Sequence, residues 1–401
     1  MSLNNTPSAN RIHIGFFGRR NAGKSSVVNA VTGQNLSIVS DVKGTTTDPV
    51  TKAMELLPLG PVVIIDTPGL DDEGAVGELR VQKAKQALNK TDIAVLVVDI
   101  TEGKNQIDED LLKLFAEKKL PYVVVYNKSD LAAKTELLPQ EIAVSAVTKD
   151  NINELKEKIA ALAAGIKQDK RVIGDLLAED DVVVLVTPID ESAPKGRMIL
   201  PQVQTIRDVL DSHAIVVTTQ VEQLAKTLSF LKNPPKVVVT DSQAFGKVKK
   251  IVPEDILLTS FSILFARFKG VLKTAVNGAV SLEKLVDGDT VLISEGCTHH
   301  RQCNDIGSVK MPKWITEYTG KQINFEYTSG TEFKEDLRKY KLIVHCGGCM
   351  LNEKEMRHRQ SRAEELQVPY TNYGIIIAYM NGILNRSLEV FPELHELLDK
   401  K

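Results

Sequence analysis

The sequence has no long apolar run and no excess of charge of either sign. No stretch reaches the length of about 18 consecutive apolar residues that a membrane-spanning helix needs. Lys and Arg number 50 and Asp and Glu number 52, which gives a formal net charge of −2. Such a balance offers no electrostatic reason to expect nucleic acid or a membrane surface as a partner. We therefore expect neither of these partners.

The N-terminus also lacks the features of a targeting segment. Residues 1–10 are polar, with no apolar core of a secretion signal and no Arg-rich amphipathic pattern. We interpret them as a flexible tail and expect a cytoplasmic protein. Hydrophobic residues make up 43% of the 401 residues and charged residues 25%, which is typical of a globular chain with two or three domains.

Cysteine is scarce and unevenly placed, because all four cysteines lie between positions 297 and 349. A large chain without a secretion signal is not expected to carry a disulfide framework. We therefore interpret the cysteines as candidate metal ligands or redox groups, gathered in one region of the chain.

Residues 11–165 alternate short Val- and Ile-rich runs with amphipathic stretches. This alternation predicts a doubly wound, mostly parallel sheet that is covered by helices on both faces. The expected strands are 11–17, 62–66, 93–99, 122–126 and 142–145. The expected helices are 25–32, 77–89, 106–117 and 152–164.

A charged stretch at 167–171 separates this domain from two further α/β regions. Region 173–262 carries no phosphate loop, metal-ligand cluster or nucleophile, so we expect a scaffold or dimerisation domain. Its apolar run 256–268 is either a dimer surface or internal core. The expected strands are 181–187, 214–219 and 236–240, and the expected helices are 201–212 and 221–231. Region 263–401 is expected to contain strands 290–294, 322–327 and 341–345 and helices 313–319, 332–338, 353–366 and 373–384.

Residues 18–25 read Gly-Arg-Arg-Asn-Ala-Gly-Lys-Ser and stand between an expected strand and an expected helix. This is the pattern of a phosphate-binding loop. Gly18 and Gly23 let the backbone N–H groups surround a phosphate. Lys24 reaches the β and γ oxygens, and Ser25 offers a hydroxyl to Mg²⁺.

Three further segments follow in the order of a guanine-nucleotide site. Residues 66–69, Asp-Thr-Pro-Gly, end a strand, so Asp66 can hold Mg²⁺ through water and the Gly69 N–H can meet the γ-phosphate. Residues 127–130, Asn-Lys-Ser-Asp, end another, and the Asp130 carboxylate can accept two hydrogen bonds that guanine offers and adenine does not. Ser145 and Ala146 then approach the guanine O6. The predicted nucleotide-binding residues are Gly18, Asn21, Ala22, Gly23, Lys24, Ser25, Ser26, Asn127, Lys128, Asp130, Ser145 and Ala146.

These four motifs resemble the translation-factor-like GTPases over the whole first domain. Asn21 and the segment Gly-Thr-Thr-Thr-Asp at 44–48 resemble the potassium-dependent branch that is related to the tRNA-modifying enzyme MnmE. The resemblance implies that Asn21 binds K⁺ and that Thr46 is the switch threonine on Mg²⁺, together with Ser25 and Asp66. The predicted catalytic residues are then Lys24, Thr46, Asp66 and Gly69.

Leu70 stands where Ras-like enzymes have the glutamine that orients the attacking water. We therefore hypothesise that intrinsic GTP hydrolysis is slow. K⁺ would partly replace the missing positive charge, so turnover in KCl and in NaCl should differ.

The cysteines follow two expected strands. Residues 297–300 read Cys-Thr-His-His and residues 345–349 read His-Cys-Gly-Gly-Cys. Both segments fall at carboxyl ends of strands, where open α/β folds have ligand sites, so they can converge. Three thiolates suit zinc or an iron–sulfur cluster, and the spacing alone leaves both open. A dithiol redox pair and metal-free thiols are the weaker alternatives.

The potassium-type GTPase region, the middle α/β region and the pattern Cys-x-His…His-Cys-x-x-Cys together resemble the FeFe-hydrogenase maturation GTPases, the HydF family, over essentially the whole chain. The resemblance implies that Cys297, Cys346 and Cys349 hold a 4Fe–4S cluster with one open iron, and that His299 and His345 are possible ligands. It implies a scaffold that assembles or delivers a two-iron precursor, with apo FeFe-hydrogenase and radical-SAM maturation enzymes as partners. The apolar runs of the middle region, including 256–268, favour a homodimer. The expected fold class is α/β: an N-terminal P-loop GTPase domain at 11–165, a small middle domain at 173–262 and a cluster-binding domain at 263–401.

Some assignments stay open at this point. Cys303 lies outside the family pattern and is either a fourth ligand or a bystander thiol. Arg357, His358, Arg359 and Arg362 predict a basic helix face, which either attracts an anionic precursor or is merely solvated. An RNA-modification or ribosome-associated GTPase with a structural zinc is the alternative function, and a redox-sensing regulator is a third. If the chain is the GTPase scaffold that the resemblance implies, GTP hydrolysis acts as a conformational switch.

Overall fold

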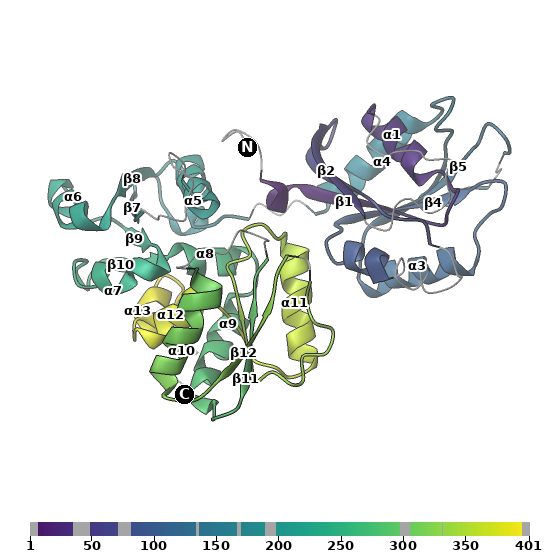
Figure 1. Cartoon of the computed structure of the whole chain (residues 1–401). Helices are drawn as coiled ribbons and strands as arrows, with labels where there is room; N and C mark the ends of the chain where they lie inside the picture. Colours follow the sequence, from purple (N-terminus) through teal and green to yellow (C-terminus); the bar gives the residue numbers. More distant parts are fainter. Residues whose placement is uncertain are drawn as a thin grey trace. The chain divides into compact units, whose positions relative to one another are not determined.

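The computed structural model describes residues 7–34, 49–70, 82–133, 136–166, 170–188, 198–296, 305–330 and 332–394. The chain divides into two compact units, Met1–Asp169 and Lys170–Lys401 (Figure 1). Within the described ranges, no helix is long and apolar enough to cross a membrane.

The first unit is built on a six-stranded sheet with the order β2-β3-β1-β4-β5-β6. Neighbouring strands are parallel except for β2 and β3, which are antiparallel. The strands are β1 Ile12–Phe17, β2 Val50–Leu56, β3 Gly60–Asp66, β4 Ile93–Asp99, β5 Tyr122–Asn127 and β6 Glu141–Ala143. The helices are α1 Lys24–Thr32, α3 Gln106–Glu117 and α4 Ile152–Ala164, and residues 82–88 are also helical.

Helices cover both faces of this sheet, so the central strands are buried on both sides. Helices α1 and α4 pack on one face through side chains such as Val28 and Ile159 (Figure 1). Helix α3 and the helical turn at 82–88 pack on the other face through Phe115 and Leu88. The near-continuous Val and Ile runs of β3, β4 and β5 are the expected composition for such strands. The predicted doubly wound fold is confirmed.

The second unit contains two four-stranded, all-parallel sheets, ordered β10-β9-β7-β8 and β12-β11-β13-β14. The strands are β7 Val182–Val186, β8 Ile215–Thr219, β9 Val237–Thr240, β10 Leu257–Ser260, β11 Thr290–Ser294, β12 Asn324–Thr328, β13 Leu342–His345 and β14 Tyr370–Asn372. The helices are α5 Leu200–Asp211, α6 Leu224–Phe230, α7 Phe245–Val248, α8 Phe261–Phe268, α9 Leu272–Ala279, α10 Met311–Thr319, α11 Glu353–Glu365, α12 Tyr373–Met380 and α13 Leu384–Leu388. Short 3₁₀ turns cover Gly174–Leu176, Val221–Gln223, Ser242–Ala244 and Val280–Lys284, and a π turn covers Ile306–Lys310. In the first unit, a 3₁₀ turn covers Ser8–Asn10.

One hydrophobic core joins the first of these sheets to helices that pack on the second. Side chains of β7, α8, α9, α12 and α13 belong to the same buried cluster. The apolar run 256–268 forms β10 and α8 and lies largely inside that core. On the second sheet, α11 covers one face, while α10 and α12 cover the other (Figure 1). The sequence-based boundary between 262 and 263 falls inside α8, and the three-domain division stays a prediction.

The helix predicted at 332–338 is wrong. The described residues 332–338 have no helical backbone. The Asp336 carboxylate accepts a hydrogen bond from the Arg338 backbone N–H at 3.1 Å, a local pairing that competes with helix formation. Leu337 is buried and Phe333 lies under the Arg359 guanidinium, so side-chain burial holds an irregular path. The helix predicted at 373–384 ends early, at Met380, before Gly382 in the left-handed region.

Candidate functional site

The phosphate-binding loop follows β1 and leads into α1, as the sequence predicts. Gly18 has φ +138°, and a Cβ there would lie 2.2 Å from the Val97 carbonyl oxygen. Gly23 has φ +84°, and a Cβ there would lie 2.2 Å from Asn127 Nδ2. Both positions therefore need glycine. Lys24 folds over the loop and donates from Nζ to the Arg19 carbonyl oxygen at 2.7 Å.

Asn127, at the end of β5, joins three of the predicted motifs. Its buried amide donates from Nδ2 to the Ala22 carbonyl oxygen in the phosphate loop at 3.1 Å. Its Oδ1 accepts from the Ala146 backbone N–H, also at 3.1 Å. Ser145 Oγ donates to Asp130 Oδ1 at 2.6 Å. A single side chain thus holds the phosphate loop and the two guanine segments in one arrangement.

Asp66 ends β3 beside the start of α1. Ser25 Oγ donates to Asp66 Oδ2 at 2.8 Å, so the two predicted Mg²⁺ ligands are in contact. At Gly69, a Cβ would lie 2.7 Å from the Arg20 Cα, which explains the glycine against the phosphate loop. Leu70 turns away into the core under α3 and is 4% exposed, so its side chain does not face the site. Asn21 is exposed and has φ +62°.

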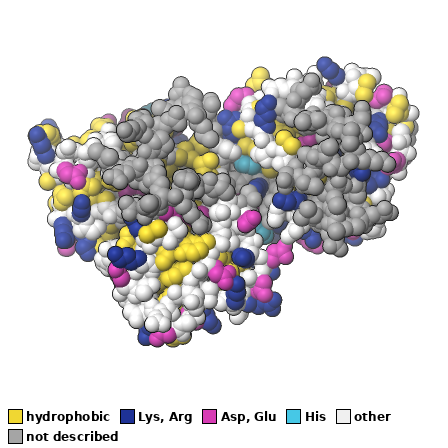
Figure 2. All heavy atoms as spheres, viewed as in Figure 1, with side chains coloured by type: hydrophobic (Ala, Val, Ile, Leu, Met, Phe, Trp, Pro, Cys, Tyr) yellow, Lys and Arg dark blue, Asp and Glu magenta, His cyan; other side chains and the backbone are white. Residues whose placement is uncertain are grey.

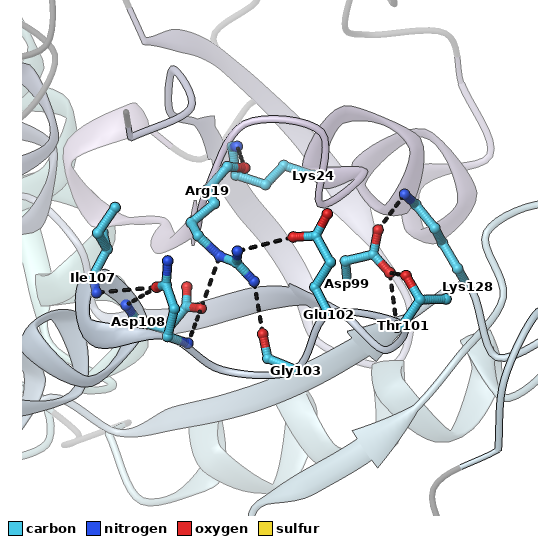
Figure 3. A network of polar contacts seen from close by, with 10 residues as sticks. Arg19, Lys24, Asp99, Thr101, Glu102, Gly103, Ile107, Asp108 and Lys128 are labelled. Atoms are coloured by element: carbon cyan, nitrogen blue, oxygen red, sulfur yellow. Dashed lines mark hydrogen bonds and ion pairs between the residues drawn. The ribbon is translucent and has the colours of Figure 1, made fainter. Parts of the chain in front are cut away.

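Arg19 ties the phosphate loop to the N-terminus of α3 (Figure 3). Its guanidinium donates to Asp108 Oδ2 at 3.1 Å, to Glu102 Oε2 at 2.9 Å and to the Gly103 carbonyl oxygen at 2.7 Å. Asp108 is fully buried, and it forms a reciprocal capping box with Asn105. Burial raises the pKa of the Asp108 carboxyl, against the effect of the Asn105 N–H and Arg19. The sequence analysis did not identify this network, although Asn105 and Asp108 stand three residues apart, at the spacing of a capping box.

Lys128 links the guanine segment to the same loop. It forms an ion pair with Asp99 at the end of β4, and Asp99 also accepts from the Thr101 N–H at 2.9 Å (Figure 3). Although burial acts to raise it, the hydrogen bonds from Lys128 and Thr101 hold the pKa of Asp99 below its usual range. The loop 99–105 therefore contacts both the phosphate loop and the guanine segment. Thr46 and the rest of segment 44–48 lie outside the described residues.

The pair Cys346 and Cys349 follows β13 in the second unit. Strands β11 and β13 run parallel with Ser294 opposite His345, and the Cys346 N–H donates to the Ser294 carbonyl oxygen at 2.8 Å. The sulfur of Cys346 accepts from the Gly296 N–H at 3.0 Å and from the Gly348 N–H at 3.4 Å. Cys297, His299, His300 and Cys303 lie outside the described residues. Within the described residues, no group of three metal-ligating side chains is assembled.

His345 is buried, and both of its ring nitrogens have partners. Nδ1 lies 2.7 Å from the Cys346 carbonyl oxygen, and Nε2 lies 3.0 Å from Arg359 Nη1. Burial and the neighbouring Arg359 guanidinium lower the pKa of His345 to about 3. The neutral ring therefore donates from Nδ1 and accepts at Nε2. In this arrangement neither nitrogen is available to a metal, and the ligand role of His345 stays a prediction.

The basic helix face predicted at 357–362 is wrong at Arg359. Arg359 is fully buried and donates to Glu355 Oε1 at 2.9 Å and to the Gly330 carbonyl oxygen at 2.8 Å, besides His345. Arg357 lies on the surface and pairs with Glu353 at 2.7 Å. The helix turns Arg359 inward because its position faces β13, which the charged sequence of α11 does not reveal.

Sequence reasoning also missed Lys269, which lies under the cysteine loop. Lys269 follows α8, is 2% exposed and donates from Nζ to the Leu351 carbonyl oxygen at 2.7 Å. Burial lowers the pKa of Lys269 to about 8, while Cys349 and Glu353 act to raise it.

Models of known protein families match three parts of the chain. Residues 13–128 match the 50S ribosome-binding GTPase model. Residues 172–270 match the hydrogen maturase F dimerization domain, and residues 273–390 match the hydrogen maturase F tetramerization domain.

Curated relatives match less than half of the chain. The tRNA modification GTPase MnmE of Chromobacterium violaceum is 35% identical over 154 residues, which is 37% of this chain and 34% of that protein. The MnmE of Streptococcus pyogenes is 30% identical over 194 residues, which is 43% of this chain and 42% of that protein. The chain thus spans less than half the length of these relatives. Among solved structures, Era of Aquifex aeolicus is 18% identical with a TM-score of 0.35, over 55% of this chain and 98% of that one. The G domain of the T. maritima FeoB iron transporter is 24% identical with a TM-score of 0.30, over 38% and 99%.

Proposed function

This chain belongs to the hydrogen maturase F family, and on that premise we propose that it is a GTP-driven scaffold that carries an iron–sulfur cluster and assembles or delivers the two-iron precursor of the FeFe-hydrogenase active site. The chain is a GTPase, and GTP and Mg²⁺ are the substrate and metal ion of such a domain. Its matched dimerization and tetramerization domains indicate an oligomer.

In the nucleotide site, each proposed role follows from where a side chain lies. Gly18 and Gly23 free the loop backbone to surround the phosphates, and Lys24 would exchange its Arg19 carbonyl partner for phosphate oxygens. Ser25 and Asp66 are in contact and would hold Mg²⁺ from two sides. Asp130 would bind the guanine edge, with Asn127 fixing its segment to the loop. The proposed nucleotide-binding set also includes Asn21, Ala22, Ser26, Lys128, Ser145 and Ala146.

Hydrolysis would depend on Lys24, Thr46, Asp66 and Gly69. Gly69 packs against the Arg20 backbone, so its N–H is close to the loop that would hold the γ-phosphate. Leu70 is buried in the core, which agrees with the absence of a water-orienting glutamine. We therefore propose that GTP hydrolysis is slow and is stimulated by K⁺ bound at Asn21. The switch role of Thr46 rests on the family resemblance, because it lies outside the described residues.

One observation carries the cluster proposal: the Gly296 N–H donates to Cys346 Sγ. Gly296 directly precedes Cys297 in the sequence, so the two cysteine segments start from adjacent strand ends. Backbone N–H groups directed at a sulfur are a usual feature of iron–sulfur sites, where they stabilise thiolates and set the potential. The donor set therefore fits a 4Fe–4S cluster held by Cys297, Cys346 and Cys349. When bound, the cluster would supply an iron with one position open to an exchangeable ligand.

The neighbouring histidines have different proposed roles. His345 is held by Arg359 and by the Cys346 carbonyl oxygen, so we propose that it orients the Cys346 backbone, and that it binds iron only if one of these two partners is exchanged. His299 remains a possible ligand, and Cys303 a possible bystander.

Anaerobic isolation tests the proposal. We expect brown protein with broad absorption near about 400 nm and with iron and sulfide in equal amounts. Cys346→Ala should lose the iron, whereas Cys303→Ala should keep it. Colourless protein with bound zinc would instead support an RNA-modification or ribosome-associated GTPase. Transfer of activity to apo FeFe-hydrogenase then separates a scaffold from a redox sensor.

The remaining partners are proposals as well. We propose a homodimer that meets apo FeFe-hydrogenase and the radical-SAM maturation enzymes in the cytoplasm, with no nucleic-acid or membrane partner. Both Lys/Arg and Asp/Glu side chains occur on each unit on the face seen in Figure 2, in keeping with the balanced composition. Light scattering of the purified protein tests the dimer.

A further inference from the structure

Lys269 lies at the base of the turn that presents Cys349. The Leu351 N–H donates to the Gly348 carbonyl oxygen at 3.0 Å, which closes a turn with Cys349 in its centre. Gly348 has φ +61°, and a Cβ there would lie 2.4 Å from Met356 Sδ, so the turn packs tightly on α11. Lys269 Nζ donates to the Leu351 carbonyl oxygen at the end of this turn. The ammonium is thereby fixed against the segment that carries the thiol.

The approach of Lys269 is built into the backbone. The Lys269 N–H completes α8 by donating to the Phe265 carbonyl oxygen at 2.9 Å. Gly270 then turns the chain at φ +73°, and a Cβ there would lie 2.5 Å from Arg357 Nη2. The left-handed backbone at 270 favours glycine, which ends α8 next to the Arg357 side chain of α11. A charge from the region matched to the dimerization domain thus reaches the cysteine loop.

A buried ammonium needs a compensating negative charge. Among the described residues, no carboxylate lies within ion-pair distance of Lys269 Nζ, and the Phe268 ring is a weak partner at 5.9 Å. Glu353 acts on this charge but already pairs with Lys170 and Arg357. Cys349 lies in the turn whose last carbonyl oxygen Lys269 binds, and as a metal-bound thiolate it would supply the missing negative charge.

We propose that Lys269 is a positioning residue of the cluster site, with its ammonium serving as the buried counter-charge of the Cys349 thiolate and of the cluster bound to it. This inference rests on the proposed cluster function. A fixed positive charge beside a ligand sulfur stabilises the more negative, reduced cluster and raises its reduction potential. The alternative is a purely structural role, in which Lys269 only satisfies the Leu351 carbonyl oxygen.

Lys269→Met separates the two roles, because methionine fills a similar volume without charge. The measurement is an EPR-monitored redox titration of the full-length, cluster-loaded protein. At a fixed potential near the midpoint we expect the oxidised-to-reduced ratio to rise roughly tenfold, which equals a lowering of about 59 mV for a one-electron couple. Lys269→Arg should restore most of the shift. Lys273→Met, an exposed lysine on α9, is the matched control and should leave the ratio unchanged.

Stability of the cluster-free protein gives the second readout. Without the thiolate-bound cluster, removing an uncompensated buried charge should leave the thermal unfolding midpoint of Lys269→Met equal to or above that of the wild type. A lower midpoint together with an unchanged ratio means that Lys269 is structural, and the inference fails. If the wild-type protein carries the cluster and Lys269→Met leaves the ratio unchanged, the inference alone fails. A wild-type protein without an iron–sulfur cluster overturns the proposed function and this inference with it.

Discussion

The nucleotide site and the cysteine loop bury their positive charges to different degrees. In the first unit, Lys24 is 7% exposed with its ammonium on a carbonyl oxygen, and the Arg19 side chain, 17% exposed, reaches acidic groups that include the exposed Glu102. In the second unit, Arg359 and Lys269 are almost completely buried beneath the cysteines. Lys24 and Lys269 each donate to a carbonyl oxygen, so the two units differ in how far they bury their cations and in the acidic partners of Arg19 and Arg359.

The largest expected effect concerns the buried cation of the second unit. Arg359→Met leaves the Glu355 carboxylate buried without its partner and His345 Nε2 without a donor. We expect a loss of about 3–5 kcal/mol in unfolding free energy, the range for breaking a buried ion pair. Trp314, the single tryptophan, lies on α10 in this unit, so denaturant unfolding followed by its fluorescence reports this unit alone.

Arg357→Met is the control for that experiment. Arg357 is on the same helix and also pairs with a glutamate, but its side chain is 56% exposed. We expect a change of about 0–1 kcal/mol. Equal losses of unfolding free energy in the two variants would show that burial does not determine how much each arginine stabilises the unit.

The next prediction concerns Lys24, which would exchange its Arg19 carbonyl partner for phosphate oxygens. Lys24→Met removes the charge that would meet the β and γ oxygens, so GTP hydrolysis should fall about 10²–10³-fold, or about 2.7–4 kcal/mol, as for loss of one transition-state donor. The iron content of the second unit should not change. Lys113→Met, an exposed lysine on α3, should hydrolyse GTP at the wild-type rate. A parallel loss of iron in Lys24→Met would contradict the independence of the two sites.

A smaller effect is expected at Asp108, the fully buried carboxylate of the first unit. Arg19→Met leaves the fully buried Asp108 without its cation, but the Arg19 side chain is 17% exposed, so we expect a loss of only about 2 kcal/mol. Adding Asp108→Asn removes the orphaned charge and retains an acceptor for the Asn105 N–H, so most of the loss should be recovered. Circular dichroism follows the unfolding, and Trp314 fluorescence should show no change. An additive double variant would mean that the two residues do not act as a pair.

The same contrast explains what the sequence could predict. The motifs around Lys24, Asp66 and Asp130 are short segments at strand ends, and their order along the chain is enough to bring them together. The β3, β4 and β5 runs predicted the sheet for a similar reason, because strands buried on both faces are apolar throughout. The edge strand β2 was missed, since most of its residues are exposed and no apolar run marks it.

The second unit was less predictable because burial there depends on tertiary packing. Nothing in the charged run from Glu353 to Glu365 distinguishes Arg359 from Arg357, yet one is buried against His345 and the other is on the surface. Lys269 lies 80 residues before Cys349 in the sequence, and only the folded chain brings its ammonium to the Leu351 carbonyl oxygen of the cysteine turn. The helix predicted at 332–338 was wrong because the local Asp336 hydrogen bond and the burial of Leu337 outweigh helical propensity.

The smallest expected effect concerns whether the first unit binds K⁺ from solution. Asn21 is exposed at the tip of the phosphate loop, with its backbone in the left-handed region, and Leu70 supplies no polar group to the site. If K⁺ binds at Asn21, GTP hydrolysis in KCl should exceed that in NaCl by roughly tenfold, or about 1.4 kcal/mol. Asn21→Ala should abolish this difference. Equal rates of the wild type in both salts would remove K⁺ from the mechanism. The first unit would then neutralise the nucleotide phosphates with its own side chains and Mg²⁺ alone. The cations of the two units would differ only in how far they are exposed.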